Sequence, residues 1–387
     1  MKILAFTSIR SDYDLLSPLL KLINEDKDHS LKLIVSGTHL SRDFGHSVDQ
    51  IYADGFDILL EVESLLASDS KASRLKSASI LFQSIIDPIG HYSPDLMIFA
   101  GDREDILIYS MIGAYLGIPT IHFYSGDHTK DGYVDNSARH AASKLASVHF
   151  VTLEEHKVRL MKMGEKSDRI YVVGNIALDR FVSFDAFTKE RLSEMFSVEE
   201  DWIANYCLVM FHPTNIEEAK MGEGLENILL SLSELGIRAF VSSPNSDPNN
   251  SSIKRVLEAY KSNKNFIFFK NMERETYLSL YKNANFIIGN SSSGICEAAS
   301  IPIPAINVGQ RQQGRFAGTN VVFVSTDKDQ ILGAIKKIQS KDFLESVKRM
   351  KNPYGDGDSA LKCLNLINQI HFSDFIEKKE DPIEVNI

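Results

Sequence analysis

Residues 95–104 read DLMIFAGDRE, a short apolar run that ends in Gly-Asp-Arg-Glu. Similar runs recur through the first 175 residues, separated by longer amphipathic stretches. This alternation is typical of repeated strand–helix units around a parallel sheet covered on both faces. It predicts an α/β, Rossmann-like, doubly wound domain over residues 1–175. The other runs in this half are KILAF, LKLIVSG, DILLEV, IPTIHFY, VHFVT and RIYVVG.

The same rhythm restarts near residue 205 and predicts a second doubly wound domain over residues 205–355. Its runs are CLVMFHP, IRAFVSS, NFIFF, NFIIGNSSS and IPAINVG. Residues 175–204 are charged, helical in pattern and without a strand signal, so we expect them to connect the two domains. A final helix is expected within residues 356–387. Two domains suit a chain of 387 residues, and the cleft between them is the expected ligand site.

The overall charge narrows the choice of partners. A formal net charge of -10 without a Lys/Arg block disfavours a nucleic-acid partner. The three cysteines are widely spaced, which suggests neither a disulfide framework nor a zinc site and favours a reducing compartment. We expect a cytoplasmic protein because no secretion signal and no membrane-spanning run is evident. A small ligand held by a few local groups fits best.

In open parallel sheets, ligands bind beyond the carboxyl ends of the strands, so the residues that follow each apolar run are the first candidates. In the first domain these are residues 7–13, 101–104 and 125–128, followed by Asp135, Arg139 and His140. In the second domain they are residues 211–214, 243–247, 289–294 and 308–311.

Three carboxylates of the first domain are the candidate catalytic groups: Asp102, Asp127 and Asp135. Carboxylates held close together in a partly dry site have pKa values that are driven apart, so that one accepts a proton while another donates one. The alternative is structural, with Asp102 and Asp135 each capping the helix that follows.

The segment Gly289–Gly294 follows an apolar run and precedes an expected helix that contains Glu297. This arrangement is typical of a phosphate held at a helix N-terminus. The alternative is a serine N-cap in a tight turn. His212 and Arg10 are further candidates for an anion, although a lone histidine is more often structural and an arginine is commonly exposed.

Several other ligand classes lose support. No Gly-x-Gly-x-x-Gly follows the first run and no Gly-Lys-Ser/Thr is present, which disfavours dinucleotide and P-loop sites. No residue cluster has metal-ligand spacing, so we expect no metal and no cofactor. Three histidines lie in or beside apolar runs and are interpreted as structural: His122, His149 and His156.

Taken together, these motifs resemble the UDP-N-acetylglucosamine 2-epimerase family, specifically its hydrolysing branch, which feeds sialic, legionaminic and related nonulosonic acid synthesis. The resemblance runs through most of the chain. It rests on the ordered motifs SIRSDYDLL, SGTHLSRDFGHS, the Gly101-Asp102-Arg103 turn, DNSARHAASKLASVHFV, RIYVVGN, FHPT, SPNSDP, GNSSSGICEAAS, INVGQRQQGR and NPYGDG.

The resemblance implies two Rossmann-like domains arranged as in GT-B glycosyltransferases, a last helix that crosses back to the first domain, and a homodimer. It assigns the catalytic carboxylates to Asp102, Asp127 and Asp135, and a ribose contact to Glu297. It assigns diphosphate contacts to Arg10, His212, Ser292 and Ser293. The remaining implied substrate-binding residues are Arg103, Arg139, His140, Asn245, Ser291, Gly294, Arg311 and Arg315.

Two departures from related patterns refine the expectation. The family usually has Gly-Gly-Glu where this chain has Ser125-Gly126-Asp127. A sugar altered near C4 to C6 could accompany that shorter acid. Non-hydrolysing relatives typically carry Gly-Thr-Arg-Pro-Glu and His-Arg-x-Glu-Asn, whereas this chain has residues 8–12 as SIRSD and 212–215 as HPTN. Both differences favour the hydrolysing branch.

The implied reaction releases UDP from a UDP-2-acetamido sugar and inverts C2 through a glycal, giving a free manno-configured sugar. The substrate would be UDP-GlcNAc or UDP-2,4-diacetamido-2,4,6-trideoxyglucose. Asp102 and Asp135 would handle the C2 proton and the water, with Asp127 as partner. Three alternatives stay open: a non-hydrolysing epimerase, a GT-B glycosyltransferase, and a catalytically weakened sensor of nucleotide sugars.

Overall fold

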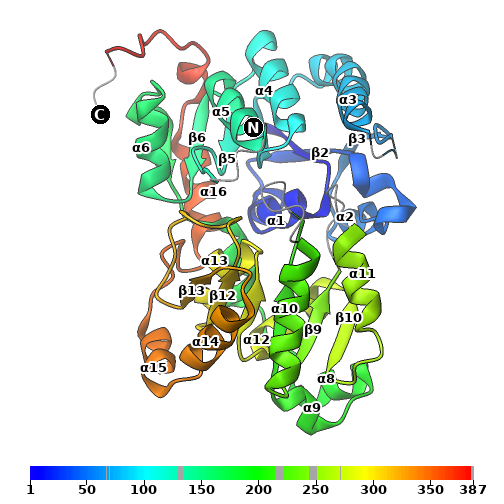
Figure 1. Ribbon diagram of the computed structural model, residues 1–387. Helices are drawn as coiled ribbons and strands as arrows, with labels where there is room; N and C mark the ends of the chain where they lie inside the picture. Colours follow the sequence, from blue (N-terminus) through cyan, green and yellow to red (C-terminus); the bar gives the residue numbers. More distant parts are fainter. Residues whose placement is uncertain are drawn as a thin grey trace. The chain divides into compact units, whose positions relative to one another are not determined.

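The computed structural model describes residues 1–66, 68, 70–129, 134–213, 221–243, 251–270 and 272–384. The chain divides into two compact units, which are described in turn (Figure 1). The first comprises Met1–Asp127, Tyr133–Asp179 and Gly357–Ile387, and the second comprises His128–Gly132 and Arg180–Asp356. Asn245, which the resemblance places in the binding site, lies outside the described residues.

The first unit is built on a parallel sheet of seven strands in the order β3-β2-β1-β4-β5-β6-β7. Each of the seven apolar runs of the first half forms one of these strands. Because the strand order reverses between β1 and β4, the sheet has a topological switch point there. The strands are β1 (Lys2–Thr7), β2 (Ser30–Ser36), β3 (Ile58–Val62), β4 (Leu96–Ala100), β5 (Thr120–Phe123), β6 (Val148–Val151) and β7 (Ile170–Val172).

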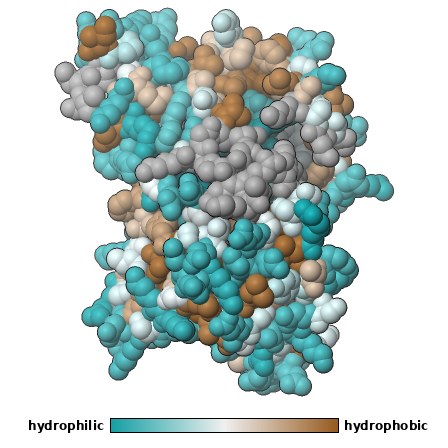
Figure 2. All heavy atoms as spheres, in the orientation of Figure 1, coloured by the Kyte–Doolittle hydropathy of each residue, from teal (hydrophilic) through white to brown (hydrophobic). Residues whose placement is uncertain are grey.

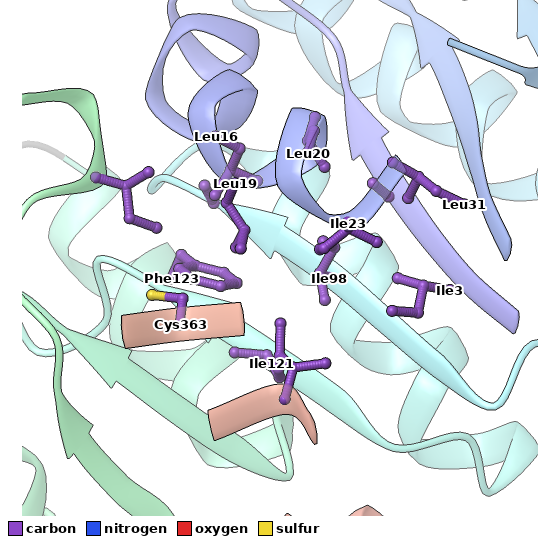
Figure 3. Close-up of a cluster of buried hydrophobic side chains, with 14 of the residues drawn as sticks. Ile3, Leu16, Leu19, Leu20, Ile23, Leu31, Ile98, Ile121, Phe123 and Cys363 are labelled. Atoms are coloured by element: carbon purple, nitrogen blue, oxygen red, sulfur yellow. The ribbon is translucent and has the colours of Figure 1, made fainter. Parts of the chain in front are cut away.

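Alternating side chains of this sheet feed two cores, one on each face. The first core packs α1 (Arg10–Glu25) and α16 (Ser359–Gln369) against the strands. Figure 3 shows the leucines of α1 facing Ile98 and Phe123, with Cys363 of α16 beside Phe123. The second core packs α3 (Lys71–Tyr92) and α4 (Glu104–Leu116) on the other face, with α5 (Val134–Leu145) beside α4. The shorter helices of this unit are α2 (Val48–Ala53) and α6 (Glu154–Lys162).

The second unit is a parallel sheet of six strands in the order β10-β9-β8-β11-β12-β13, with its switch point between β8 and β11. The sequence predicts the first five strands but misses β13. All four residues of β13 are apolar, but the run is short and follows a turn-rich segment. The strands are β8 (Tyr206–Met210), β9 (Arg238–Ser242), β10 (Phe266–Phe269), β11 (Ile287–Gly289), β12 (Ala305–Val308) and β13 (Val321–Val324).

The helices of the second unit also build two cores. One core holds α10 (Met221–Glu234), α11 (Ser251–Ala259) and α14 (Lys328–Ile338). The other holds α12 (Arg274–Asn283) together with helices from the segment expected to be a connector. That segment is therefore packed into this core through Phe181, Leu192 and Ile203. The remaining helices are α7 (Asp179–Ser183), α8 (Lys189–Phe196), α9 (Glu200–Ala204), α13 (Ser293–Cys296) and α15 (Lys341–Arg349).

Ion pairs and hydrogen bonds hold the C-terminal residues 371–380 on the first unit. Arg169 pairs with Glu380 at 2.8 Å and also donates to the backbone carbonyls of Phe375 and Glu377. Lys378 reaches the buried carboxylate of Glu165 at 2.6 Å. These contacts make residues 371–380 an integral part of this unit.

None of the described helices combines the length and the apolar character needed to cross a lipid bilayer. The three cysteines are free thiols, and Cys207 and Cys363 are buried.

Candidate active site

The predicted residues of the first unit gather at the carboxyl ends of β4 and β5 and on α5. Asp102 and Arg103 follow β4, Asp127 follows β5, and Asp135 lies in the first turn of α5. Arg139 and His140 lie further along the same helix. This edge of the sheet is where parallel α/β folds place their ligands.

Arg139 of α5 contacts the residues that follow both β4 and β5. This residue is only 4% exposed, and its guanidinium forms an ion pair with the Asp102 carboxylate. It also donates to the Asp127 carbonyl at 3.0 Å. The N-cap of α4 is Arg103, without a side-chain capping bond, so the alternative that Asp102 caps this helix is wrong. The Asp102 carboxylate is instead held by an arginine of α5.

Asp135 is coupled to Asp102 and to an arginine that the sequence did not point to. The guanidinium of Arg74, on α3, lies 3.3 Å from the Asp135 carboxylate, and its Nε donates to Glu104 at 2.7 Å. Burial raises the pKa of Asp135 to about 6, with the charge of Asp102 adding to the rise and Arg74 and Arg103 opposing it. Asp135 therefore changes its protonation state close to neutral pH.

The turn that replaces the usual Gly-Gly-Glu is fixed against α6. Gly126 has a φ of +74°, and a Cβ at this position would lie 2.5 Å from the His156 carbonyl oxygen, so glycine is required. The His156 imidazole lies 3.4 Å from the Asp127 carboxylate. His156 is thus more than the core histidine that the sequence predicts, because its ring faces a candidate catalytic acid.

Arg10 is the first residue of α1 and is exposed, with its Nε 3.8 Å from Asp14. His122 has the structural role predicted for it: its ring is buried and hydrogen-bonds the Gly101 carbonyl at 3.2 Å. This contact fixes the backbone just before Asp102.

In the second unit, the side chain of Asn290 joins the ends of β8 and β11. The backbone N–H of His212 donates to the Asn290 side-chain oxygen at 2.7 Å, and the Asn290 amide donates to the His212 carbonyl at 2.8 Å. Arg311 donates to the Asn290 carbonyl at 3.0 Å. Gly289 makes the close approach possible, since a Cβ there would lie 2.0 Å from the Met210 carbonyl oxygen. Asn290 therefore positions both His212 and Arg311.

His212 is neutral in this environment. Burial, together with the charge of Arg311, lowers its pKa to about 3. The ring can offer a hydrogen bond to an anion but no positive charge, which differs from the charge-neutralising role considered from the sequence. Arg311 carries the charge beside it, and Arg315 donates to Gln312 at 3.0 Å in the same loop.

The serine-rich turn differs from the sequence expectation in one respect. The helix after it, α13, has only four residues, and Glu297 lies one residue beyond its end. A single turn has a small dipole, so its N-terminus attracts an anion less than a full helix does. Two serines, Ser291 and Ser292, are partly exposed next to Gly294.

Ser293 faces inward from that turn. Its hydroxyl donates to the Glu297 carboxylate, and the Tyr281 hydroxyl donates to the Ser293 carbonyl at 2.8 Å. Glu297 also lies 3.7 Å from Arg180. The contact with Ser293 therefore fixes the Glu297 carboxylate at the edge of the turn.

No group of three or more His, Cys, Asp or Glu side chains within the described ranges is arranged to hold a metal ion.

A family model described as UDP-N-acetylglucosamine 2-epimerase matches residues 21–368. The chain belongs to this family. A Legionella pneumophila protein named UDP-N,N'-diacetylbacillosamine 2-epimerase (hydrolyzing) is 30% identical, with 95% of this chain and 96% of the relative covered. A Campylobacter jejuni protein named GDP/UDP-N,N'-diacetylbacillosamine 2-epimerase (hydrolyzing) is 33% identical, with 89% of each covered. The family predicted from the motifs is thereby confirmed.

Solved structures of this family share the fold. A UDP-GlcNAc 2-epimerase from Neisseria meningitidis bound to UDP-GlcNAc has a TM-score of 0.81 at 18% identity, with 96% of this chain and 100% of that chain covered. The predicted fold class of two doubly wound Rossmann-like domains is confirmed by this likeness and by the two parallel sheets.

Proposed function

We propose that this family member is a hydrolysing nucleotide-sugar 2-epimerase, which releases UDP from a UDP-2-acetamido sugar and gives a free manno-configured sugar. The observation that carries the proposal is the coupled pair Asp102 and Asp135, each held by an arginine. It is supported by relatives at 30% and 33% identity that are named as hydrolysing 2-epimerases. Their names favour a 2,4-diacetamido-2,4,6-trideoxy sugar over GlcNAc as the substrate.

We assign different parts of the substrate to the two units. We assign the nucleoside diphosphate to the second unit, with Arg311, His212 and Ser292 as donors to the phosphates and Glu297 as an acceptor for ribose hydroxyls. We assign the sugar to the first unit, with Asp102, Asp127 and Asp135 as its acids. Fixed donors at the leaving diphosphate stabilise the charge that develops as the C1–O bond breaks.

The chemistry requires two proton transfers at C2. The C2 hydrogen is not acidic until the bond from C1 to the diphosphate begins to break. A carboxylate then takes the C2 proton and a glycal forms. In the second half, a protonated acid on the opposite face gives its proton to C2, water gives its hydroxyl to C1, and the remaining water proton goes to a carboxylate.

We assign the C2 proton to Asp135 and the water to Asp102. Asp135 has its pKa raised to about 6, which suits a base that works near neutral pH. Asp102 is fixed by Arg139, and this arrangement suits a group that orients a water molecule. Asp127, which faces His156, would contact the sugar as a partner of these two acids.

The proposal is tested by incubating the protein with UDP-2,4-diacetamido-2,4,6-trideoxyglucose and with UDP-GlcNAc. Equal amounts of UDP and free manno-configured sugar are expected. An intact UDP-linked epimer would point to a non-hydrolysing enzyme, and a product formed only with an added acceptor would point to a glycosyltransferase. Binding without any product would point to a sensor.

The raised pKa of Asp135 predicts how kcat/KM changes at acidic pH. Because the base must be ionised, kcat/KM is expected to fall about tenfold per pH unit below pH 6, where Asp135 becomes protonated. Asp135→Asn should lower kcat/KM by about 10²- to 10⁴-fold and leave the residual rate independent of pH in this range. An unchanged acid limb in the variant would contradict the assignment.

We further propose that the free sugar feeds the synthesis of a nonulosonic acid, as the sequence resemblance implies. The proposal is supported by an Escherichia coli relative named Polysialic acid biosynthesis protein P7, which is 28% identical with 98% of this chain covered. The three free thiols suit the cytoplasm, which we keep as the proposed compartment.

We also propose that the protein is a homodimer that pairs through α3 and α4, which lie side by side in the first unit. Apolar residues gather on the surface where Figure 1 places α4 (Figure 2). Tyr115 on α4 is 84% exposed and Leu75 on α3 is 71% exposed. Exposed apolar patches of this kind mark association sites.

The dimer predicts a specific response to mutation. Leu75→Glu with Tyr115→Asp is expected to convert a dimer into a monomer in sedimentation experiments, because the buried charges would have no partners. Leu361→Glu changes a leucine of α16 that is also exposed and should leave the dimer intact. A wild-type monomer at micromolar concentration would contradict the proposed dimer.

A further inference from the structure

A serine and two aspartates meet at the end of β1, outside the group of acids assigned above. The Oγ of Ser8 lies 2.5 Å from a carboxylate oxygen of Asp105 on α4, and 3.1 Å from one of Asp12 on α1. A serine hydroxyl carries a single proton, so it can donate to only one of the two acids. The second contact is a hydrogen bond only if that acid carries a proton and donates it to Oγ.

The distances indicate which acid holds the proton. If Ser8 donates along the shorter contact to Asp105, the proton of the second hydrogen bond must come from Asp12. The serine is well fixed in this place, because it is buried and its carbonyl accepts from the backbone N–H of Thr38 at 2.9 Å. A Cβ on Gly37 would lie 2.7 Å from the same carbonyl oxygen, which shows how closely the ends of β1 and β2 approach.

The charged neighbours of Asp12 agree with this assignment. Burial raises the pKa of Asp12 to about 7, the charges of Asp105 and Asp102 add to the rise, and Arg103 and Ser8 oppose it. Asp12 is thus still largely protonated near pH 6.

The surroundings of Asp105 raise the pKa of that acid as well. Burial raises the pKa of Asp105, the charge of Glu104 adds to the rise, and Ser8, Arg103 and Arg74 oppose it. Tyr109, which is buried on the same helix, stays neutral because burial raises its pKa well above the usual value. Two partly buried acids that contact the same serine favour a shared proton over two full charges.

We propose that Asp12, Ser8 and Asp105 form a relay that holds one proton, so that Asp12 is a neutral acid and leaves the charge of Arg103 to the anionic substrate. A shift along the relay moves the Asp12 proton to the Ser8 oxygen and the Ser8 proton to Asp105. One proton thus moves toward Asp105 and one negative charge moves toward Asp12. No other bond changes.

Asp12 is therefore a positioning residue that acts on substrate binding through Arg103. When Asp12 is ionised, its carboxylate competes with the substrate for the guanidinium. This consequence rests on the proposed function, because it takes Arg103 to face the nucleotide sugar. The existence of the relay does not rest on that function, and the two are tested by separate measurements.

The first measurement is an infrared titration of the full chain from pH 5 to 9, which follows the carbonyl band of protonated carboxyl groups. Besides the loss near pH 6 expected from Asp135, the wild type is expected to lose one carboxyl band with a midpoint near pH 7. Asp12→Asn should abolish this transition, because the amide replaces the acid and still donates to Ser8. Asp105→Asn should lower the midpoint by about one pH unit or more, because it removes a negative charge next to Asp12.

The matched control is Asp43→Asn, which changes an exposed aspartate of the same unit and should leave the titration as in the wild type. A wild type without a titrating carboxyl group between pH 6 and 8 would overturn the relay. The same conclusion would follow if the transition persisted unchanged in both Asp12→Asn and Asp105→Asn.

The second measurement is the pH dependence of KM for the nucleotide sugar. The wild-type KM is expected to rise about fivefold from pH 6.5 to 8.5 as Asp12 ionises, with kcat nearly constant, because the attraction between two partly exposed charges is modest. In Asp12→Asn the KM should stay flat. A parallel rise in both proteins would overturn the role given to Arg103. If the wild type releases no UDP from any nucleotide sugar, the proposed function fails while the infrared result still decides the relay.

Discussion

Asp102→Asn is expected to lower kcat by about 10²- to 10⁴-fold, the usual contribution of one positioned acid–base group. The amide keeps the shape of the side chain but cannot take a proton from the attacking water. The loss should appear in kcat more than in KM, because the change leaves the contacts to the nucleotide in place. Release of UDP under saturating substrate is the measurement.

Folding must be separated from chemistry in this variant, because the change also removes the charge that pairs with the buried guanidinium of Arg139. Circular dichroism and calorimetric binding of UDP should match those of the wild type. Asp43→Asn, at an exposed position, serves as the control for activity. A fully active Asp102→Asn protein would remove Asp102 from the mechanism.

Glu165→Gln is expected to cause the largest loss of stability, about 3 to 5 kcal/mol, the usual cost of breaking a buried ion pair. The Glu165 carboxylate is fully buried and contacts Lys144 at 2.5 Å, Lys378 at 2.6 Å and His149 at 3.1 Å. Glutamine would leave the partly buried ammonium of Lys378 without the charge of Glu165. Urea unfolding of the first unit, followed by circular dichroism, is the measurement.

The pH dependence of this effect has a definite sign. Burial alone would raise the pKa of Glu165, but the hydrogen bond and charge of His149 and the nearby lysines lower it to about 2. The stabilisation is therefore present above the unfolded value of 4.5 and is lost as the pH falls from there toward 2. The difference between the two proteins should shrink over that range.

Glu155→Gln is the control, because that glutamate pairs with Arg159 at the exposed surface of α6. It should cost less than about 1 kcal/mol. A Glu165→Gln protein as stable as this control would show that the end of the chain is not held by the buried charges.

The fold could be predicted because parallel strands that are buried on both faces consist of unbroken runs of apolar residues. All seven runs of the first half and all five of the second became strands. β13 is also an unbroken apolar run, VVFV, but it was missed because it has only four residues and follows a turn-rich segment. The segment 175–204 gave no strand signal, but its sequence could not show that Phe181 and Ile203 would enter a core.

The sequence predicted site residues only where they follow one strand or lie on one helix. Strand ends pointed to Asp102 and Asp127, and the spacing on one helix linked Asp135 to Arg139. Arg74 was missed because it lies 61 residues before Asp135 and in the middle of the pattern of a long helix. His156 was missed for a similar reason, since a histidine beside an apolar run gives no sign of what its ring will face.

Contacts between residues of different elements could not be predicted from the sequence either. Ser8 and Asp105 are 97 residues apart, and only the packing of α4 beside β1 brings them together. The length of α13 is another case, because the serine-rich turn suggests a helix start without indicating that the helix ends after one turn.

The most direct test of the proposed reaction is the isotope content of the liberated sugar after turnover in deuterated water. Inversion through a glycal requires that C2 be reprotonated from groups that exchange with solvent, so one deuterium at C2 of a free manno-configured sugar is predicted. A free sugar that keeps its original C2 hydrogen and configuration would mean simple hydrolysis, and would contradict the assignment of Asp135 as the group that takes the C2 proton.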